Sequence, residues 1–195
     1  MKEVKIISLS GHIGAGKNEI AKIAAKQFGY KPLMLAGLTK SVISQVYGVS
    51  LEELEDRDKK EKWRPLVIQY AEKMKEVDLY VHCKYVSELI KKDLAHTGSG
   101  SYLISDLRYP YESLYFRKFD RCSQHVCEME YEGFKGYQVS YKSIYVESDL
   151  TTNTSTDVSE SHYNYFKKNN EGIITNGQVE REDNSKLVSQ LVKFL

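Results

Sequence analysis

Hydrophobic and polar positions along the chain follow two patterns in turn: short apolar runs and longer stretches with helical spacing. Residues 4–10 form an apolar run that is typical of a buried strand, and a glycine-rich loop follows it directly. Behind the loop, apolar residues recur at the three- and four-residue intervals of a helix as far as Phe28. Gly29 then supplies the residue type that commonly ends a helix. The pattern therefore predicts a strand, a loop and a helix at the start of the chain.

The same two patterns continue to the end of the sequence. Short strands are predicted at 31–35, 102–105 and 172–175, and strands or a hairpin at 124–146. Helices are predicted at 38–47, from the capping box 50–53 onward, at 66–75 after a restart at 63–65, at 78–94, from Pro110 onward, at 159–168 and at 183–195. Strands that alternate with helices predict an α/β fold with three layers, in which helices flank a parallel sheet.

The loop after the first strand has the spacing of a phosphate-binding P-loop, with Gly11, four further residues, and then Gly16 and Lys17. Glycines permit a sharp turn and let the main chain approach phosphate oxygens where a Cβ would clash. Backbone N–H groups and the helix N-terminus can cradle the phosphates, and the Lys17 ammonium can reach them. We therefore expect a nucleotide to bind at Gly11, His12, Ile13, Gly14, Ala15, Gly16, Lys17, Asn18 and Glu19.

Asn18 departs from the usual pattern, because a Ser or Thr hydroxyl at this position ligates Mg²⁺. An amide oxygen can also coordinate a hard cation or hold a metal-bound water, although its side chain is longer. Asn18 therefore marks either a variant that handles Mg²⁺ differently or a loop that has lost catalysis. The loop sequence alone leaves both alternatives open.

The composition indicates an ordinary globular protein. The 195 residues carry a formal net charge of +1, which gives no argument for binding to nucleic acid or to an anionic membrane. No stretch approaches the roughly 18 apolar residues of a membrane span, and the N-terminus enters the first strand at once, so we expect a cytoplasmic protein. Three cysteines argue against a disulfide framework. Cys122, His125 and Cys127 lack the second ligand pair that a structural zinc site needs.

A second group of candidate residues follows the strand at 102–105. Strands of an open α/β sheet deliver the residues at their carboxyl ends to the ligand crevice. There Asp106 can hold Mg²⁺ or its water together with Asn18, and the planar fork of Arg108 can bridge the donor and acceptor phosphates. The alternative is that Asp106 caps the next helix and Arg108 is exposed. Beside a P-loop we favour the functional interpretation, with Lys17, Asp106 and Arg108 as catalytic residues.

Two further groups of cations are candidates, although an exposed helix face is the alternative for each. The first group lies on helices between the first and third strands, where an acceptor anion could dock, and consists of Lys40, Arg64 and Lys75. The second group follows Asp106 and is typical of cations that close over a nucleotide as a lid and exclude water: Arg117, Lys118 and Arg121.

Together these pieces resemble the phage-type deoxynucleoside monophosphate kinases, a P-loop kinase family related to the P-loop phosphomevalonate kinases. The resemblance extends over nearly the whole chain in the order of that family. Its specific parts are the loop at 11–18 and the Asp-x-Arg strand at 104–112. Its softer parts lie at 35–40, 64–75, 159–162 and 174–177. The segment 124–157 matches poorly.

The resemblance implies a P-loop kinase fold in a single domain over residues 1–195, with an acceptor-binding helical region at about 36–95 and a mobile lid at about 115–160. It implies ATP as the donor and Mg²⁺ as the metal, and it places Asn176 and Gly177 near the adenine. It also makes a viral origin, and hence the host cytoplasm, plausible. The acceptor site that it implies comprises Lys40, Arg64, Gln69, Lys75, Arg108 and Glu160.

We therefore predict an enzyme that transfers the γ-phosphoryl group of ATP to a (deoxy)nucleoside monophosphate by in-line positioning and charge stabilisation. One alternative is another small phosphorylated acceptor, such as phosphomevalonate, and a second is a nucleotide-binding module without turnover. Trp63, Tyr70 and Tyr109 are the aromatic side chains that could stack on a base. The expected partners are small-molecule nucleotides, without nucleic acid or membrane, and a homodimer is possible.

Overall fold

The computed structural model describes residues 2–56, 58–122, 134–149, 162–177 and 184–195, apart from the side chains of residues 121 and 122. The chain separates into two compact units. The sheet unit combines Met1–Leu33 with Ile90–Leu195, and the helical unit consists of Met34–Leu89. The bounds of the helical unit, 34–89, overlap the region at about 36–95 for which the family resemblance implied acceptor binding, a role that stays a prediction.

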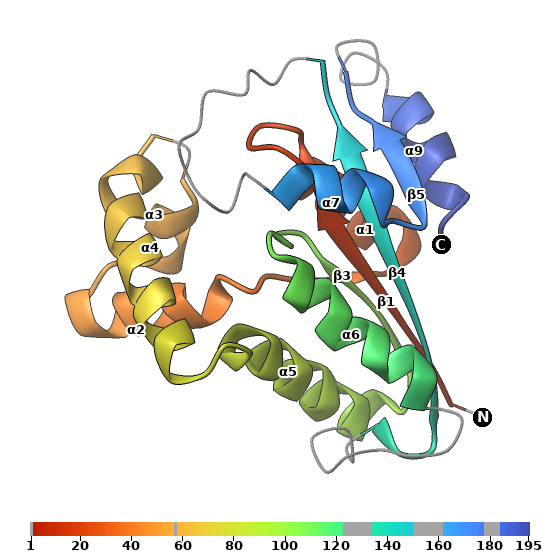
Figure 1. Cartoon of the computed structure of the whole chain (residues 1–195), viewed down its shortest axis with the longest axis horizontal. Helices are drawn as coiled ribbons and strands as arrows, with labels where there is room; N and C mark the ends of the chain where they lie inside the picture. Colours follow the sequence, from red (N-terminus) through yellow and green to blue (C-terminus); the bar gives the residue numbers. More distant parts are fainter. Residues whose placement is uncertain (1, 57, 123–133, 150–161, 178–183) are drawn as a thin grey trace. The chain divides into compact units, whose positions relative to one another are not determined.

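The sheet unit is built on five parallel strands in the order β2-β3-β1-β4-β5 (Figure 1). Along the chain these strands are β1 (Lys2–Ser10), β2 (Lys31–Leu33), β3 (Gly100–Ile104), β4 (Tyr137–Glu147) and β5 (Gly172–Thr175). The central strand β1 is almost fully buried from Ile6 onward, its two serines included, because β3 and β4 flank it and helices cover both of its faces. The predicted α/β fold with a parallel sheet is confirmed.

Helices cover both faces of this sheet (Figure 1). On one face, α1 (Lys17–Phe28) and α9 (Asn184–Val192) pack into a core that includes Ile7 and Leu9 of β1. On the other face, α6 (Pro110–Cys122) and α7 (Tyr163–Lys168) pack against β4. The two faces follow from the alternation of side chains along each strand.

A buried chain of hydroxyls joins the second face to α6. Tyr141 of β4 shares a hydrogen bond of 2.6 Å with Ser8 of β1, and it donates a hydrogen bond of 3.1 Å to Ser113 of α6. Burial raises the pKa of the Tyr141 phenol to about 12, so the phenol stays protonated as a donor. The contact fixes α6 over the centre of the sheet.

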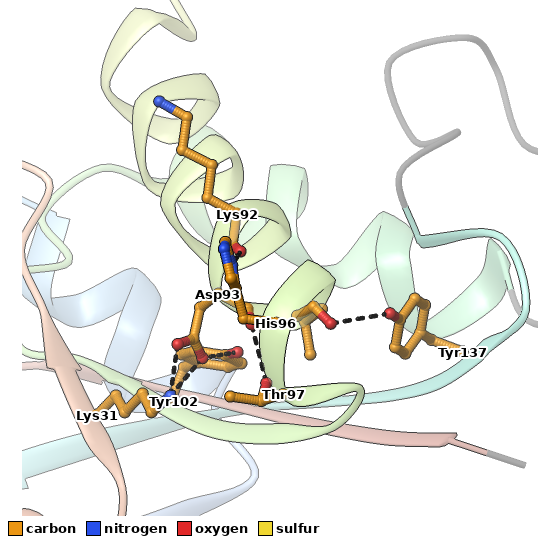
Figure 2. Close-up of polar contacts among 8 residues, drawn as sticks. Lys31, Lys92, Asp93, His96, Thr97, Tyr102 and Tyr137 are labelled. Carbon is orange, nitrogen blue, oxygen red and sulfur yellow. Dashed lines mark hydrogen bonds and ion pairs between the residues drawn. The ribbon is translucent and has the colours of Figure 1, made fainter.

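A second polar network holds the end of α5 (Val81–Thr97) to the sheet (Figure 2). The carboxylate of Asp93 accepts hydrogen bonds from Lys31, at 2.5 Å, and from the phenol of Tyr102, at 2.6 Å. The hydrogen bond from Lys31, and after it the one from Tyr102, lowers the pKa of the Asp93 carboxyl below its usual value. Burial and the Asp93 carboxylate raise the pKa of the Tyr102 phenol. Tyr137 of β4 donates a further hydrogen bond of 3.3 Å to the carbonyl of Leu94.

The helical unit contains α2 (Gly37–Tyr47), α3 (Leu51–Glu55), α4 (Lys60–Val77) and the first part of α5. Its small core consists of Ile43, Val49 and Leu54, with Trp63, Leu66, Val67 and Tyr70 of α4 packed against it. The predicted capping box is only half present. Ser50 accepts a hydrogen bond of 3.1 Å from the backbone of Glu53, whereas the Glu53 carboxylate accepts one of 3.0 Å from the Trp63 indole.

The structure corrects one predicted element and decides between two alternatives for another. First, α4 begins at Lys60 and continues through Pro65, whereas the sequence predicted a restart at 63–65 and a helix at 66–75. Pro65 lacks one N–H, but packing of the apolar α4 residues on the core of the helical unit outweighs that loss. Second, of the strands or hairpin predicted over 124–146, the described part contains a strand, since β4 begins at Tyr137 and runs parallel to both of its neighbours. Residues 124–133 lie outside the described part of the chain.

The expected lid region at 115–160 also includes parts of the core. Phe116 and Phe119 of α6 are fully buried, and β4 lies between β1 and β5 in the sheet. Within the described ranges, no helix combines the length and the hydrophobicity that crossing a membrane requires.

Candidate functional site

The phosphate loop joins the end of β1 to the start of α1, and neighbouring backbone limits which residues it can contain. A Cβ at Gly11 would lie 2.3 Å from the carbonyl oxygen of Val146, and Gly11 adopts a φ of 138° that other residues avoid. Ala15 is fully buried and donates a backbone hydrogen bond of 3.1 Å to the carbonyl of His12. The loop therefore has a defined shape that closes directly onto the N-terminus of α1.

Lys17, the first residue of α1, folds back over this loop. Its half-buried ammonium group donates hydrogen bonds to the carbonyl oxygens of Gly11 and His12, the second at 2.9 Å. Both contacts hold the positive charge where the loop and the helix N-terminus meet. A phosphate oxygen bound in the loop would compete for the same ammonium protons.

Two other segments of the sheet unit brace the loop. The ring of His12 lies against the ring of Tyr163 of α7, with 3.8 Å between the ring centroids. Asn176, immediately after β5, is buried, and its side-chain amide donates a hydrogen bond of 2.8 Å to the carbonyl of Ala15. The family resemblance connects Asn176 with the adenine and does not predict its contact with the loop. No local sequence signal reveals that contact, because the two residues are 161 positions apart.

Asp106 and Arg108 lie just beyond β3, at the same carboxyl edge of the sheet as the loop. Ile104 of β3 is in register with Ser8 of β1, and the backbone of Leu107 donates a hydrogen bond of 3.1 Å to the carbonyl of Leu9. The side chain of Leu107 is buried, whereas Asp106 and Arg108 on either side of it are half-buried. The fold thus brings the predicted Asp-x-Arg sequence to the edge of the sheet where β1 enters the phosphate loop.

Glu112 fixes the turn that carries these two side chains. Its buried carboxylate accepts hydrogen bonds from the backbone N–H groups of Arg108, at 2.8 Å, and of Tyr109, at 2.9 Å. An acidic residue in the first turn also complements the positive end of the α6 dipole. This role of Glu112 is absent from the predictions made from the sequence, although a Glu shortly after Pro110 is a recognisable capping signal.

Asn18 and Asp106 are the predicted metal ligands. Asn18 is exposed on the first turn of α1, and Asp106 is half-buried. Among the described residues, no three His, Cys, Asp or Glu side chains are grouped as they would be to hold a metal ion. Mg²⁺ in phosphotransferases takes only one or two protein oxygens and completes its shell with phosphates and water, so a single carboxylate and an amide fit its requirements.

The predicted acceptor cations of the helical unit each form an ion pair within that unit. Lys40 of α2 pairs with Glu55, and two cations of α4 pair one turn away, Arg64 with Glu61 at 3.3 Å and Lys75 with Glu72 at 2.5 Å. Gln69 of α4 is exposed. Glu160 lies outside the described residues.

Arg117, one of the predicted lid cations, has contacts inside the sheet unit. Its guanidinium pairs with Glu171, donates a hydrogen bond of 3.2 Å to the carbonyl of Asn169 and lies 5.7 Å from the ring of Tyr141. Lys118 is exposed on α6. The side chain of Arg121 lies outside the described residues, as do His125 and Cys127 of the sequence segment considered for zinc.

A strand, a phosphate loop and a helix at the centre of a parallel sheet, with an Asp-x-Arg sequence after the adjacent strand, are the arrangement of a P-loop nucleotide-binding protein. The chain belongs to the phosphomevalonate kinase family, because the model of that family matches residues 9–122. The matched segment contains the phosphate loop, the helical unit and the Asp-x-Arg turn. Phosphoryl transfer is therefore the type of reaction to which the chain is assigned, and a kinase family implies ATP as the donor.

The similarities of this chain to solved structures are weaker than its match to the family model. The chain is similar to dephospho-CoA kinase from Campylobacter jejuni, with 13% identity and a TM-score of 0.49 over 100% of this chain and 98% of that one. It is also similar to TT1252 from Thermus thermophilus, with 18% identity and a TM-score of 0.48 over 98% of this chain and 96% of that one. Identities and scores this low carry no information about the substrate. Comparison with curated proteins gave no significant match.

Proposed function

We propose that this protein transfers the γ-phosphoryl group of ATP to the phosphate of a (deoxy)nucleoside monophosphate, producing ADP and a nucleoside diphosphate. In this reaction the bond between the γ-phosphorus and its bridging oxygen breaks, and a bond from an acceptor phosphate oxygen forms. The observation that carries the proposal is the position of the Asp106–Arg108 turn beside the end of β1, where the phosphate loop with Lys17 begins. Donor-binding and charge-stabilising groups thus lie at one edge of one sheet.

On the donor side, the backbone N–H groups of the loop and the N-terminus of α1 would bind the phosphates of ATP. Lys17 would exchange its contacts with the Gly11 and His12 carbonyls for phosphate oxygens. Asp106 and Asn18 are the residues that would hold Mg²⁺, which neutralises the charge on the phosphates when bound. None of these steps requires a covalent bond to the enzyme.

On the acceptor side, the guanidinium of Arg108 is suited to bind phosphate oxygens in a bidentate way and to stabilise charge in the transition state. Glu112 holds the backbone of Arg108, so the residue is presented from a fixed turn. Arg64, Gln69, Lys40 and Lys75 of the helical unit are candidates to bind the remainder of the acceptor.

The aromatic side chains that follow Arg108 favour an acceptor that contains a planar base. The rings of Tyr109 and Tyr111 stack with 5.3 Å between their centroids, and His162 lies 5.5 Å from Tyr109. Base–aromatic stacking contributes about 1–3 kcal/mol per base in nucleic-acid complexes. Trp63 and Tyr70 are weaker candidates for stacking on a base, because both side chains pack on the core of the helical unit.

Membership of the phosphomevalonate kinase family favours a second acceptor, phosphomevalonate itself. A coupled assay of ADP release with Mg-ATP, run against deoxy- and ribonucleoside monophosphates and phosphomevalonate, distinguishes the two. Turnover with one or a few nucleoside monophosphates is the expected result, and its rate should fall sharply in Lys17→Ala and in Arg108→Ala. Lys22→Ala is the matched control, since Lys22 is an exposed cation on the same helix as Lys17.

The remaining outcomes separate the alternatives. Turnover with phosphomevalonate alone would replace the nucleotide acceptor and leave the phosphotransferase in place. Binding of ATP without turnover of any acceptor would support a nucleotide-binding module in which Asn18 no longer permits normal use of Mg²⁺.

A further inference from the structure

Asn176 is connected to the phosphate loop through both its backbone and its side chain. Its backbone N–H donates a hydrogen bond of 2.8 Å to the carbonyl of Glu147, which extends the pairing of β4 and β5 by one residue. Its side-chain amide donates one of 2.8 Å to the carbonyl of Ala15. The backbone contact holds Asn176 to the sheet, and the side-chain contact holds the loop to Asn176.

The side chain of Asn176 also occupies the space beside Gly16. A Cβ at Gly16 would lie 1.9 Å from the amide nitrogen of Asn176, so the two residues fit only because Gly16 has no side chain. Gly16 has a φ of 87° and immediately precedes α1. Asn176 therefore contacts the part of the loop from which the N–H groups at the start of α1 face a phosphate.

The side-chain oxygen of Asn176 indicates which of the two polar atoms of the amide makes Asn favourable at this position. Its side-chain oxygen is buried without a hydrogen-bond partner among the described residues. A buried polar atom left unpaired costs about 1–3 kcal/mol, so an amide is unfavourable here unless its donor is needed. The donor contact with Ala15 is the interaction that offsets this cost.

We propose that Asn176 is a positioning residue for the phosphate loop, which acts through Ala15 and Gly16 on the binding of the ATP phosphates and not through contact with the adenine. This inference rests on the proposed binding of ATP at the loop. It differs from the assignment that the family resemblance implied, in which Asn176 and Gly177 lie near the base.

Positioning of the loop and contact with the adenine differ in their effect: the first affects binding of the phosphates, and the second affects binding of the base. Titration calorimetry with ATP and with inorganic tripolyphosphate, on the wild type, Asn176→Ala and Asn176→Ser, separates them. If Asn176 positions the loop, the dissociation constants of both ligands should rise by the same factor, about tenfold, as expected for loss of one buried hydrogen bond. If Asn176 contacts the base, only the dissociation constant of ATP should rise, which would overturn the proposal.

Gln190→Ala is the matched control. Gln190 of α9 forms two side-chain hydrogen bonds to the backbone of Thr175, the residue before Asn176, at 2.9 and 3.0 Å. Its removal should lower the stability to urea and leave both dissociation constants unchanged. An equal loss of affinity in Gln190→Ala would mean that the effect comes from general loosening of β5, and the proposal would fall.

The remaining outcomes are also decisive. Unchanged affinities in both Asn176 variants would overturn the proposal, and so would loss of folding in both, since Asn176 would then support the fold as a whole. A wild-type protein that binds ATP but not tripolyphosphate would also overturn it, because the loop would then contribute little affinity. Failure of the wild type to bind ATP would refute the proposed function itself, before any variant is measured.

Discussion

The carboxylate of Glu112 accepts a hydrogen bond of 2.8 Å from the backbone N–H of Arg108, and thereby links the first turn of α6 to the residue proposed to bind the transferring phosphate. The same carboxylate oxygen accepts a second hydrogen bond, of 2.9 Å, from Tyr109. Glu112 is almost fully buried. It therefore acts both as a cap of α6 and as a support for the turn that presents Arg108.

Replacing Glu112 by Ala should lower kcat/KM by about tenfold, because loss of two charge-assisted hydrogen bonds frees the turn and misplaces Arg108. Glu112→Gln keeps an acceptor oxygen and should lose less. The measurement is steady-state ADP release with the acceptor identified in the panel, together with the free energy of unfolding in urea for each variant.

A double-mutant cycle shows whether Glu112 works through Arg108. If it does, Glu112→Ala combined with Arg108→Ala should be no slower than Arg108→Ala alone, since there is no guanidinium left to misplace. Additive losses from the two substitutions would mean that Glu112 supports activity only through the stability of α6.

Gly11→Ala should prevent the phosphate loop from adopting its shape. The new Cβ would lie 2.3 Å from the carbonyl oxygen of Val146 at a φ of 138°, so β4 or the loop must move. We expect destabilisation by more than about 2 kcal/mol, since a clash with backbone adds to the strain of the conformation. Binding of ATP should be lost together with stability.

Gly29→Ala separates the effect of the steric clash at Gly11 from the backbone strain of an alanine at positive φ. Gly29 has a φ of 70° at the end of α1, and no atom lies within 4 Å of the added Cβ. This variant should lose only about 1 kcal/mol and keep its affinity for ATP. Equal destabilisation by the two substitutions, measured by urea unfolding, would show that the approach of Gly11 to Val146 does not matter.

The parts of the site that could be predicted from sequence are those in which neighbouring residues carry the signal. The phosphate loop is such a part, because its glycines, its lysine and the flanking strand and helix fall within residues 4–28. The Asp106–Arg108 turn is another, because a short apolar strand ends directly before it. Each of these interpretations needed only the local period of hydrophobicity and the rule that ligands bind at the carboxyl ends of parallel strands.

What could not be predicted depends on contacts between distant segments. The hydrogen bond between Asn176 and Ala15, and the contact of the Tyr163 ring with the His12 ring, require the order of strands, which a single sequence does not provide. Pro65 was interpreted as a boundary because the local rule disfavours proline within a helix, whereas packing of α4 on the helical core overrides that rule. The ion pair of Arg117 with Glu171 likewise could not be told from an exposed helical cation by its sequence neighbours alone.

The Asp93 network in Figure 2 predicts how stability depends on acid. Hydrogen bonds from Lys31 and Tyr102 lower the pKa of the Asp93 carboxyl in the folded protein below its usual 3.8. The charged carboxylate therefore stabilises the fold above pH 3.8, and this contribution is lost as the pH falls through the lowered pKa. Asp93→Asn should cost about 1 kcal/mol at pH 7, because it removes the charge from a partly exposed network.

The difference in unfolding free energy between the wild type and Asp93→Asn should shrink as the pH falls below 3.8, and urea unfolding at several pH values measures it. Glu3→Gln is the control, since Glu3 is an exposed carboxylate on β1 and its replacement should have little effect at any pH. Because the partners of Asp93, Lys31 and Tyr102, are in register with Ile6 of β1 and not with the carboxyl end that enters the phosphate loop, Asp93→Asn should leave the affinity for ATP unchanged at pH 7. A constant difference between wild type and Asp93→Asn across the pH range would contradict the role of the charged carboxylate.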